Sequence, residues 1–314
     1  MGKSYFEKYE EWTEFKHKII EHYLWIWASK VGKSSLENKV FYIDGFAGGG
    51  IYKGTYDGSP LIAAKISMKY SDQSKKGKRL IECIFVERDK KLADHLAIAL
   101  SELGFQHFHI YTGTFGKHIR EIVESVKGFP AFIFIDPFGV KAIPFGTLKP
   151  LFGLNEKTEL MINFNLPGLN RLAGWVRHNV RPDEQGFFPL IQPKSKEMKN
   201  SKRTRQSNIK IVSEVLSSES WLRVIGRYEY NSDAFYEELL NIYKGNLGRH
   251  FTVVDPYPIR ARKGIKGRLK YYLIHCANHP EARRVMHEAV SRESRKAEYS
   301  NGQTNIPFKE RSDY

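Results

Sequence analysis

Residues 40–50, VFYIDGFAGGG, combine a short apolar run, an aspartate and a cluster of glycines. The apolar run predicts a buried strand that ends at Asp44, because continuous apolar stretches of this length are typical of strands covered on both faces. The glycines at positions 45, 48, 49 and 50 let the backbone turn tightly and approach a ligand closely, where a Cβ atom would collide. The stretch therefore predicts a strand followed by a ligand-binding loop, with a simple tight turn as the alternative.

Strands and helices alternate after this loop. Ser59-Pro60 has the composition of a helix start, because Ser caps a first turn and Pro fits the first helical position. The pattern then predicts strands at 80–86, 107–112, 130–135 and 158–164, with helices at 89–103 and 116–127. This alternation predicts an α/β fold with a mostly parallel sheet and helices on both faces.

Polar residues mark the ends of the predicted strands. In a parallel sheet the carboxyl ends of the strands meet at one edge, and ligands bind there, near the point where the strand order reverses. We therefore expect a pocket lined by the residues that end four of the strands: Asp44, Glu87, Asp136, and the pair Asn163 and Asn165.

The flanking segments contain further helices and strands. Aromatic and aliphatic residues at three- and four-residue steps predict a helix over 4–29. Helices are also expected at 207–217 and 232–244. The segments 251–259 and 269–277 predict a C-terminal antiparallel hairpin with a basic tip.

Two stretches lack any apolar period. Residues 192–206 are polar and basic and predict a mobile loop, and the residues from 291 onward predict a polar tail. We therefore divide the chain into an N-terminal helical segment (1–39), a single α/β domain (40–290) with a basic insertion near 192–206, and a polar tail (291–314).

Composition and charge narrow the classes of function. The 314 residues are 41% hydrophobic, which excludes global disorder, and no run approaches the roughly 20 apolar residues of a membrane span. The first residues, MGKSYFEKYEEWTEF, alternate charged and aromatic side chains, so no secretory signal is expected. The two cysteines, Cys83 and Cys276, lie far apart, which favours a reducing, cytoplasmic compartment.

The chain is strongly basic. Its net charge is +15, and residues 171–314 carry 27 Lys and Arg against 16 Asp and Glu. This concentration favours nucleic acid or another phosphate-rich partner, with a solvated basic surface as the alternative. The candidate nucleic-acid contacts come from two basic stretches: Lys202, Arg203, Arg205, Arg260, Arg262, Lys263, Lys266 and Arg268. The histidines lack the compact spacing of a metal site, so no metal site is expected from them.

The glycine cluster does not match the common phosphate-binding loops. Both the G-x-G-x-x-G and the GxxxxGK[ST] spacings are absent, and the acid precedes the glycines. Residues 44–50, DGFAGGG, instead resemble the first motif of class I S-adenosylmethionine-dependent methyltransferases, in the D-x-F-A-G-x-G form of nucleic-acid methyltransferases. The resemblance implies a Rossmann-like class I methyltransferase fold and S-adenosylmethionine as cofactor.

The same resemblance implies roles for particular residues. The glycine loop would wrap the methionine part of the cofactor, and Glu87 would bind the ribose hydroxyls with its two oxygens. The residues after the third strand would contact the adenine. The implied cofactor-binding residues are Asp44, Gly45, Phe46, Gly48, Gly50, Glu87, Thr114 and Phe115.

A second motif, Asp136-Pro137-Phe138-Gly139, resembles the fourth motif of amino-methyltransferases, (D/N/S)-P-P-(Y/F/W). In that family the acid and a backbone carbonyl accept hydrogen bonds from the target amine while the aromatic ring stacks on a base. The resemblance implies that Asp136, Pro137 and Phe138 are catalytic. This sequence has one proline where the motif has two, so a strand-end turn is the alternative.

A longer set of segments is similar to the bacterial three-Cys-motif partner proteins. The set covers about residues 40–280 in order: YIDGFAGGGIYKG, GSPLIAA, FVERD, FIFIDPFGVKAIPF, INFNLPGLNR and YYLIHCANHP. This resemblance implies a protein partner that bears three cysteines, and it fixes no substrate.

Three functions are compatible with these patterns. The first is a methyltransferase that acts on nucleic acid, at an amine or another heteroatom. The second is a non-catalytic module of the same fold that binds nucleic acid or a partner protein. The third is a nuclease that holds a divalent metal on Asp44, Glu87 and Asp136, although the glycine cluster would then have no purpose.

Overall fold

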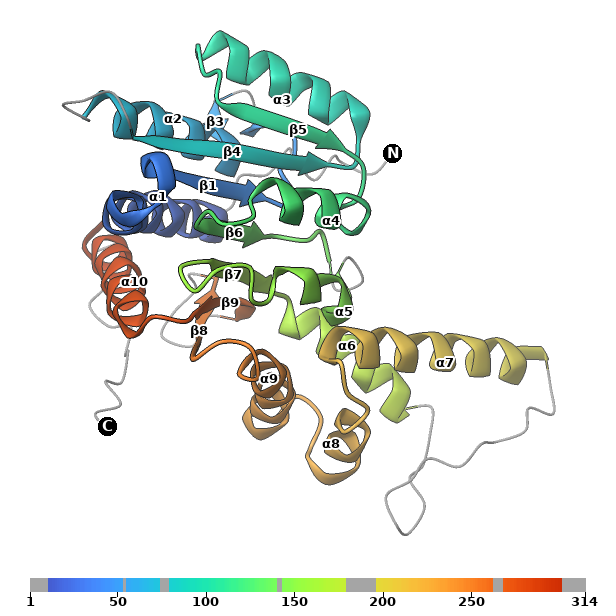
Figure 1. Cartoon of the computed structure of the whole chain (residues 1–314). Helices are drawn as coiled ribbons and strands as arrows, with labels where there is room; N and C mark the ends of the chain where they lie inside the picture. The colour runs from blue at the N-terminus through green and yellow to red at the C-terminus, as the bar shows by residue number, and fades with distance from the viewer. Residues whose placement is uncertain are drawn as a thin grey trace.

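The computed structural model describes residues 11–52, 55–73, 79–139, 143–178, 196–261 and 268–300, with only the backbone given for 178, 196–203 and 296–300. A seven-stranded sheet forms the centre of the molecule (Figure 1). Its strands, in chain order, are β1 Lys39–Asp44, β4 Leu80–Glu87, β5 Phe108–Thr112, β6 Ala131–Ile135, β7 Glu159–Phe164, β8 Val253–Arg260 and β9 Leu269–Ala277. Two short strands, β2 Ile51–Tyr52 and β3 Tyr56–Asp57, form a separate hairpin.

The strand order is β5-β4-β1-β6-β7-β9-β8. The first five strands are parallel, and β9 runs antiparallel to both of its neighbours. The chain thus leaves β1 toward β4 and β5, then returns to the other side of β1 with β6 and β7, so the order reverses at β1. This topology confirms the predicted fold class, a Rossmann-like class I methyltransferase fold with a C-terminal antiparallel hairpin.

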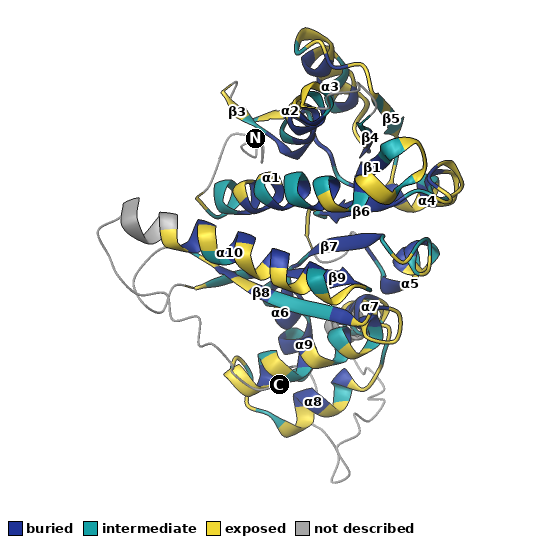
Figure 2. Ribbon diagram, turned by 60° about the vertical axis from the view of Figure 1, so that its left-hand side comes forward, coloured by how far each residue is buried: buried dark blue, intermediate teal, exposed yellow. Residues whose placement is uncertain are grey.

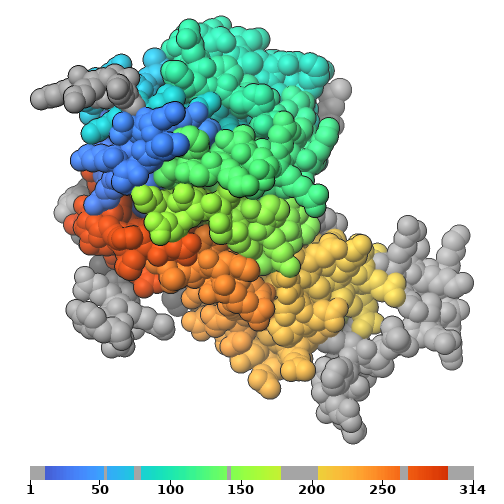
Figure 3. All heavy atoms as spheres, in the orientation of Figure 1, coloured from blue at the N-terminus to red at the C-terminus, as the bar shows by residue number. Residues whose placement is uncertain are grey.

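Helices cover both faces of the sheet, and each face has its own apolar core. The helices over one face are α1 Glu11–Val31, α2 Ser59–Asp72, α3 Lys90–Glu102 and α10 Pro280–Ser300. The helices over the other face are α4 Phe115–Ser125, α5 Phe145–Leu148, α6 Leu166–His178, α7 Lys196–Leu216, α8 Trp221–Arg227 and α9 Asp233–Leu247. The inner strands β1, β4, β6 and β7 are buried between these layers (Figure 2), whereas the outer strands β5 and β8 are partly exposed. Helices α7 to α9 form a lobe on the β7 side of the sheet (Figure 3).

Two predictions about the polar stretches were wrong. Within the predicted loop at 192–206, residues 196–206 belong to α7, because the buried positions Val212 and Leu216 anchor a helix that continues backward through good helix formers. Residues 291–300 of the predicted tail belong to α10, where buried Glu293 and Ser294 extend the stripe of buried residues on that helix. Residues 192–195 and 301–314 lie outside the described part of the chain.

The N-terminal helix shares a core with the sheet. It begins at Glu11, and the predicted residues 4–10 lie outside the described ranges. Ile20, Leu24 and Trp27 of α1 pack into the same core as strands β1 and β6. The division of the chain at residue 39 stays a prediction. None of the helices in the described ranges combines the length and the apolar character that a membrane span needs.

Candidate functional site

The carboxyl edge of the sheet brings the predicted acids to one place. Asp44 ends β1, Glu87 ends β4, and Asp136 follows β6, the neighbour of β1 on the other side. Asp44 pairs in register with Phe85 of β4 and Phe134 of β6. The three acids therefore lie on both sides of the point where the strand order reverses, which is where sheets of this type bind their ligands.

Asp44 lies beneath the glycine loop and is fully buried. Its Oδ1 accepts a hydrogen bond from the Phe46 backbone N–H at 3.0 Å, and its Oδ2 accepts from the hydroxyls of Ser59 at 2.6 Å and Tyr42 at 3.4 Å. Burial raises the pKa of Asp44 to about 6. The structure thus shows Asp44 organising the loop from below.

The glycine loop is tied to the end of β4. The backbone N–H of Gly48 donates to Oε2 of Glu87 at 2.8 Å, and that of Ala47 donates to the Val86 carbonyl at 2.9 Å. Gly48 and Gly50 have φ angles of 65° and 82°, which L side chains rarely adopt. A Cβ atom at Gly50 would also lie 2.6 Å from Leu61. Glycine is therefore required at position 50 by both conformation and space.

Glu87 is a buried carboxylate with hydrogen-bonding capacity left over. It is 6% exposed, and its other oxygen, Oε1, accepts the Asp89 backbone N–H at 2.8 Å. Each carboxylate oxygen can accept two hydrogen bonds, and each accepts one from the loop backbone. The remaining lone pairs suit a ligand that carries two hydroxyl groups.

The two predicted adenine contacts, Thr114 and Phe115, differ in their exposure. Thr114 is exposed at the start of α4, beside Gly113, whose N–H donates to the Glu87 carbonyl at 2.9 Å. Phe115 is only 2% exposed, and its ring carbon would lie 3.1 Å from a Cβ at Gly45. Phe115 therefore supports the loop from the core, while Phe46 is half-buried above it.

Asp136 has two partners: Asn163, which the sequence placed at this edge, and Lys16, which it did not. Lys16 of α1 forms an ion pair with its Oδ2, and the side-chain amide of Asn163 donates to its Oδ1. Lys16 is 5% exposed and lies over the rings of Phe134 and Tyr271 at 5.6 and 5.8 Å. The one indication in the sequence is spacing, because Lys16 precedes Ile20 by four residues and so lies on the apolar face of the helix.

The neighbours of Asp136 complete this part of the edge. Pro137 is half-buried, and Phe138 is 48% exposed. His17, next to Lys16 on α1, is buried, and burial together with the charge of Lys16 lowers its pKa to about 3. His17 is therefore neutral at pH 7.

Arginines and tyrosines line a hollow of about 640 Å³ beside this edge. The hollow includes Arg260 and Arg268, which the sequence predicted, and also Arg171 in the middle of α6. It lies at the carboxyl edge because Tyr272, one of its residues, pairs with Phe164 at the end of β7. Tyr230 and Tyr236 add two more rings, and Asp233 and Glu237 add two carboxylates.

Of the other predicted basic residues, Arg205 is the one whose side chain is described, and it does not line this hollow. Lys202 and Arg203 lie on α7, where the backbone alone is described, and Arg205 is half-buried on the same helix. Arg262, Lys263 and Lys266 lie outside the described part of the chain.

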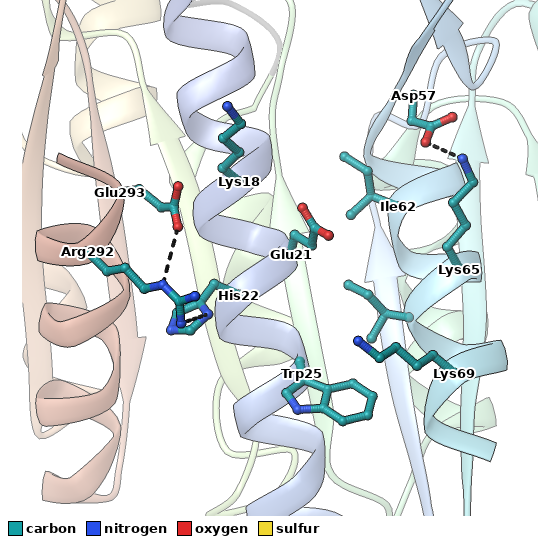
Figure 4. Close-up of a pocket in the computed structure, with 11 residues that line it drawn as sticks. Lys18, Glu21, His22, Trp25, Asp57, Ile62, Lys65, Lys69, Arg292 and Glu293 are labelled. Atoms are coloured by element: carbon teal, nitrogen blue, oxygen red, sulfur yellow. Dashed lines mark hydrogen bonds and ion pairs between the residues drawn. The ribbon is translucent and has the colours of Figure 1, made fainter. Parts of the chain in front are cut away.

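A separate hollow of about 470 Å³ lies between α1, α2 and α10 (Figure 4). Cations and carboxylates alternate around it, and several are paired, as in Lys65 with Asp57 at 2.5 Å and Arg292 with Glu293 at 4.0 Å. It contains none of the predicted site residues. We therefore place the candidate site at the carboxyl edge of the sheet.

The alternative function, a nuclease with a divalent metal on Asp44, Glu87 and Asp136, gains no support from the side chains at this edge. Asp136 is held by Lys16 and Asn163, and Asp44 is fully buried. Over the described ranges, no group of three or more His, Cys, Asp or Glu side chains is arranged to hold a metal ion.

Several solved methyltransferase structures resemble this chain weakly. Human methyltransferase-like protein 13 in complex with SAH is 11% identical, with 96% of this chain and 97% of that chain covered and a TM-score of 0.38. The O-methyltransferase TomG from Streptomyces achromogenes in complex with SAM is 13% identical over 87% and 92% of the chains, with a TM-score of 0.36. An rRNA methylase from Streptococcus thermophilus is 12% identical over 49% and 76%, with a TM-score of 0.30.

The fold assignment rests on the strand order of this chain and not on these likenesses. No protein-family model and no curated protein matches the sequence. The similarity to the three-Cys-motif partner proteins therefore stays a resemblance.

Proposed function

We propose that the chain is an S-adenosylmethionine-dependent methyltransferase that acts on nucleic acid. The observation that supports this most is the glycine loop, whose Gly48 N–H is bound to Glu87 where the strand order of a class I methyltransferase sheet reverses. The loop leaves room for close backbone approach, and Glu87 keeps lone pairs for two hydroxyls, so these residues fit an adenosyl ligand. The cofactor would supply an electrophilic methyl group to a heteroatom of the substrate.

The protein's own residues would bind and orient the two reactants. Glu87 would accept the ribose hydroxyls, Gly48 and Gly50 would border the methionine part, and Thr114 would lie near the base. Asp44 would place negative charge beneath the loop. Asp136, Pro137 and Phe138 would face the substrate, with the exposed Phe138 ring stacking on a base. Most of the rate enhancement would come from this positioning.

Binding of S-adenosylmethionine, measured by titration calorimetry, tests the cofactor site. We expect wild type to bind and Glu87→Ala to lose affinity at least about 100-fold, because two hydrogen bonds to a charged acceptor disappear. Glu82→Ala is the matched control, since Glu82 lies on the same strand and pairs with Lys39. A folded wild type that does not bind would refute the cofactor assignment, and binding without transfer would favour the non-catalytic module.

The arginine and tyrosine hollow supports nucleic acid as the substrate class. Arginines bind phosphates and tyrosine rings stack on bases, so the two residue types together suit a single strand. The partner protein implied by the three-Cys-motif resemblance belongs to this proposal as a source of further contacts.

Salt-dependent binding of a fluorescent single-stranded RNA tests this substrate class. We expect Arg260→Ala and Arg268→Ala each to lower the slope of log affinity against log salt by about one, because each removes one phosphate contact. Arg284→Ala is the control, since Arg284 lies on α10 and pairs with Glu281 and Glu288. Equal slopes for all four proteins would argue against a phosphate-binding hollow.

A further inference from the structure

The carboxylate of Asp136 is already engaged within the protein. Its Oδ2 pairs with the Lys16 ammonium, and its Oδ1 accepts the Asn163 amide. Each oxygen keeps one lone pair, as the oxygens of Glu87 do, but the Lys16 ammonium already neutralises the charge of the carboxylate. In this chain both oxygens have partners on other elements, α1 and β7.

Lys16 is fixed in place by the core. Ile19, Ile20 and Leu24 of the same helix are fully buried. The Tyr271 hydroxyl also donates to the Trp12 carbonyl at 2.9 Å, which ties the start of the described helix to β9. Moving the buried Lys16 ammonium away from Asp136 would leave a charge without its partner, so the ion pair is a lasting part of the site.

Asn163 presents a neutral acceptor beside the paired Asp136 carboxylate. Its Nδ2 must face the Asp136 carboxylate, because the amide oxygen would be repelled there. The opposite atom, Oδ1, is buried and has no hydrogen-bond partner among the described residues. Asn163 also lines a hollow of about 20 Å³ with Pro137 and Asn165, which is large enough for one small polar group. A buried acceptor without a partner is costly unless a ligand satisfies it.

Resting on the methyltransferase function proposed above, we propose that Asn163 receives the target group through Oδ1 and that Asp136 and Lys16 position it. The target is then a neutral hydrogen-bond donor, such as the exocyclic amine of a nucleobase or a hydroxyl. A lysine side chain arrives as an ammonium and must lose a proton before it can attack, so it is disfavoured as a target beside the Lys16 ammonium, which already neutralises the Asp136 carboxylate. Asn163 thus favours neutral donors, such as the exocyclic amines of nucleobases, over lysine side chains.

Thermal unfolding of Lys16→Met, Asp136→Asn and the double variant tests the permanence of the ion pair without any assay of activity. We expect Lys16→Met to lower the unfolding temperature, because it leaves the Asp136 charge without its partner. The double variant should regain most of the loss. Additive losses would mean that Lys16 and Asp136 do not act as a pair, which would overturn the proposal.

Transfer of tritiated methyl groups from S-adenosylmethionine to total RNA, sheared DNA and polylysine tests the acceptor role. We expect Asn163→Ala to lower kcat about 30-fold with little change in KM for the cofactor, since one charge-oriented hydrogen bond to the target is lost. Asn155→Ala is the control, because its Oδ1 accepts the Lys157 N–H at 2.8 Å near the start of β7, at the other end of the strand from the candidate site.

The outcomes separate this inference from the proposed function. If Lys16→Met raises turnover or allows polylysine to be methylated, Asp136 is the acceptor and Lys16 blocks it. If wild type labels RNA or DNA and Asn163→Ala does so equally, the inference is wrong and the proposed function stands. If wild type binds no cofactor or labels no nucleic acid, the proposed function is wrong and the inference falls with it.

Discussion

Asp44→Asn is expected to unfold at a higher temperature than wild type at pH 8 and to differ little from it at pH 4. Burial raises the pKa of Asp44 from 3.8 to about 6. Because the folded protein holds this proton more tightly than the unfolded chain, stability is greatest below about pH 4 and is lost as the pH rises through 6. A shift of this size corresponds to about 3 kcal/mol of unfolding free energy at pH 8. Asparagine removes the charge and keeps an acceptor for the Phe46 N–H.

The same substitution is expected to weaken binding of S-adenosylmethionine about tenfold at pH 8. A carboxylate beneath the glycine loop attracts a cationic ligand, and in a buried position that attraction is poorly screened. Calorimetry and thermal unfolding of one protein preparation measure both effects. Asp94→Asn is the control, because Asp94 is an exposed acid on α3 that pairs with Lys90. A variant that is less stable than wild type at pH 8 would show that the ionised carboxylate stabilises the loop.

The loss of stability caused by burying the charged Asp44 side chain also explains why this part of the candidate site could be predicted from the sequence. An acid and four glycines in seven residues favour neither a packed strand nor a helix, so only a loop that needs them accounts for their presence. Glu87 was predictable for the same reason, because it interrupts an apolar run at its end. Each of these two signals lies within a few residues of the strand end that it marks, so it can be seen without knowing the fold.

The rest of the site depends on contacts that are distant in sequence. Lys16 and Asp136 lie 120 residues apart, and the helical pattern around Lys16 shows only that it lies on the apolar face. Phe115 follows the third predicted strand, where an adenine contact was expected, yet its ring is buried and packs against Gly45. The ends of α7 and α10 were missed for a different reason, since polar helices extended from a packed part carry no apolar period of their own.

At the amino ends of the parallel strands, away from the candidate site, a buried polar network joins α1 to β7 and β9. Oε2 of Glu159 accepts the Tyr23 hydroxyl at 2.5 Å and lies 2.7 Å from Nε2 of His275. The exposed fractions of Tyr23 and His275 are 1% and 0%. Burial and the Glu159 charge raise the pKa of Tyr23, so its hydroxyl stays a donor. α1 is thus held by one acid at each edge of the sheet, Asp136 near its start and Glu159 beyond its middle.

Glu159→Ala is expected to lower the unfolding temperature by roughly 10 °C while leaving the affinity of the folded protein for S-adenosylmethionine unchanged. The substitution leaves two buried polar groups without their acceptor, which costs about 3–5 kcal/mol. Glu159 begins β7, whereas the candidate site lies at the other end of the strands, so the cofactor site keeps its geometry. Glu156→Ala, an exposed neighbour, should change the unfolding temperature by less than about 2 °C. If Glu159→Ala instead kept the wild-type unfolding temperature and lost affinity for S-adenosylmethionine, the network would be part of the cofactor site and not separate from it.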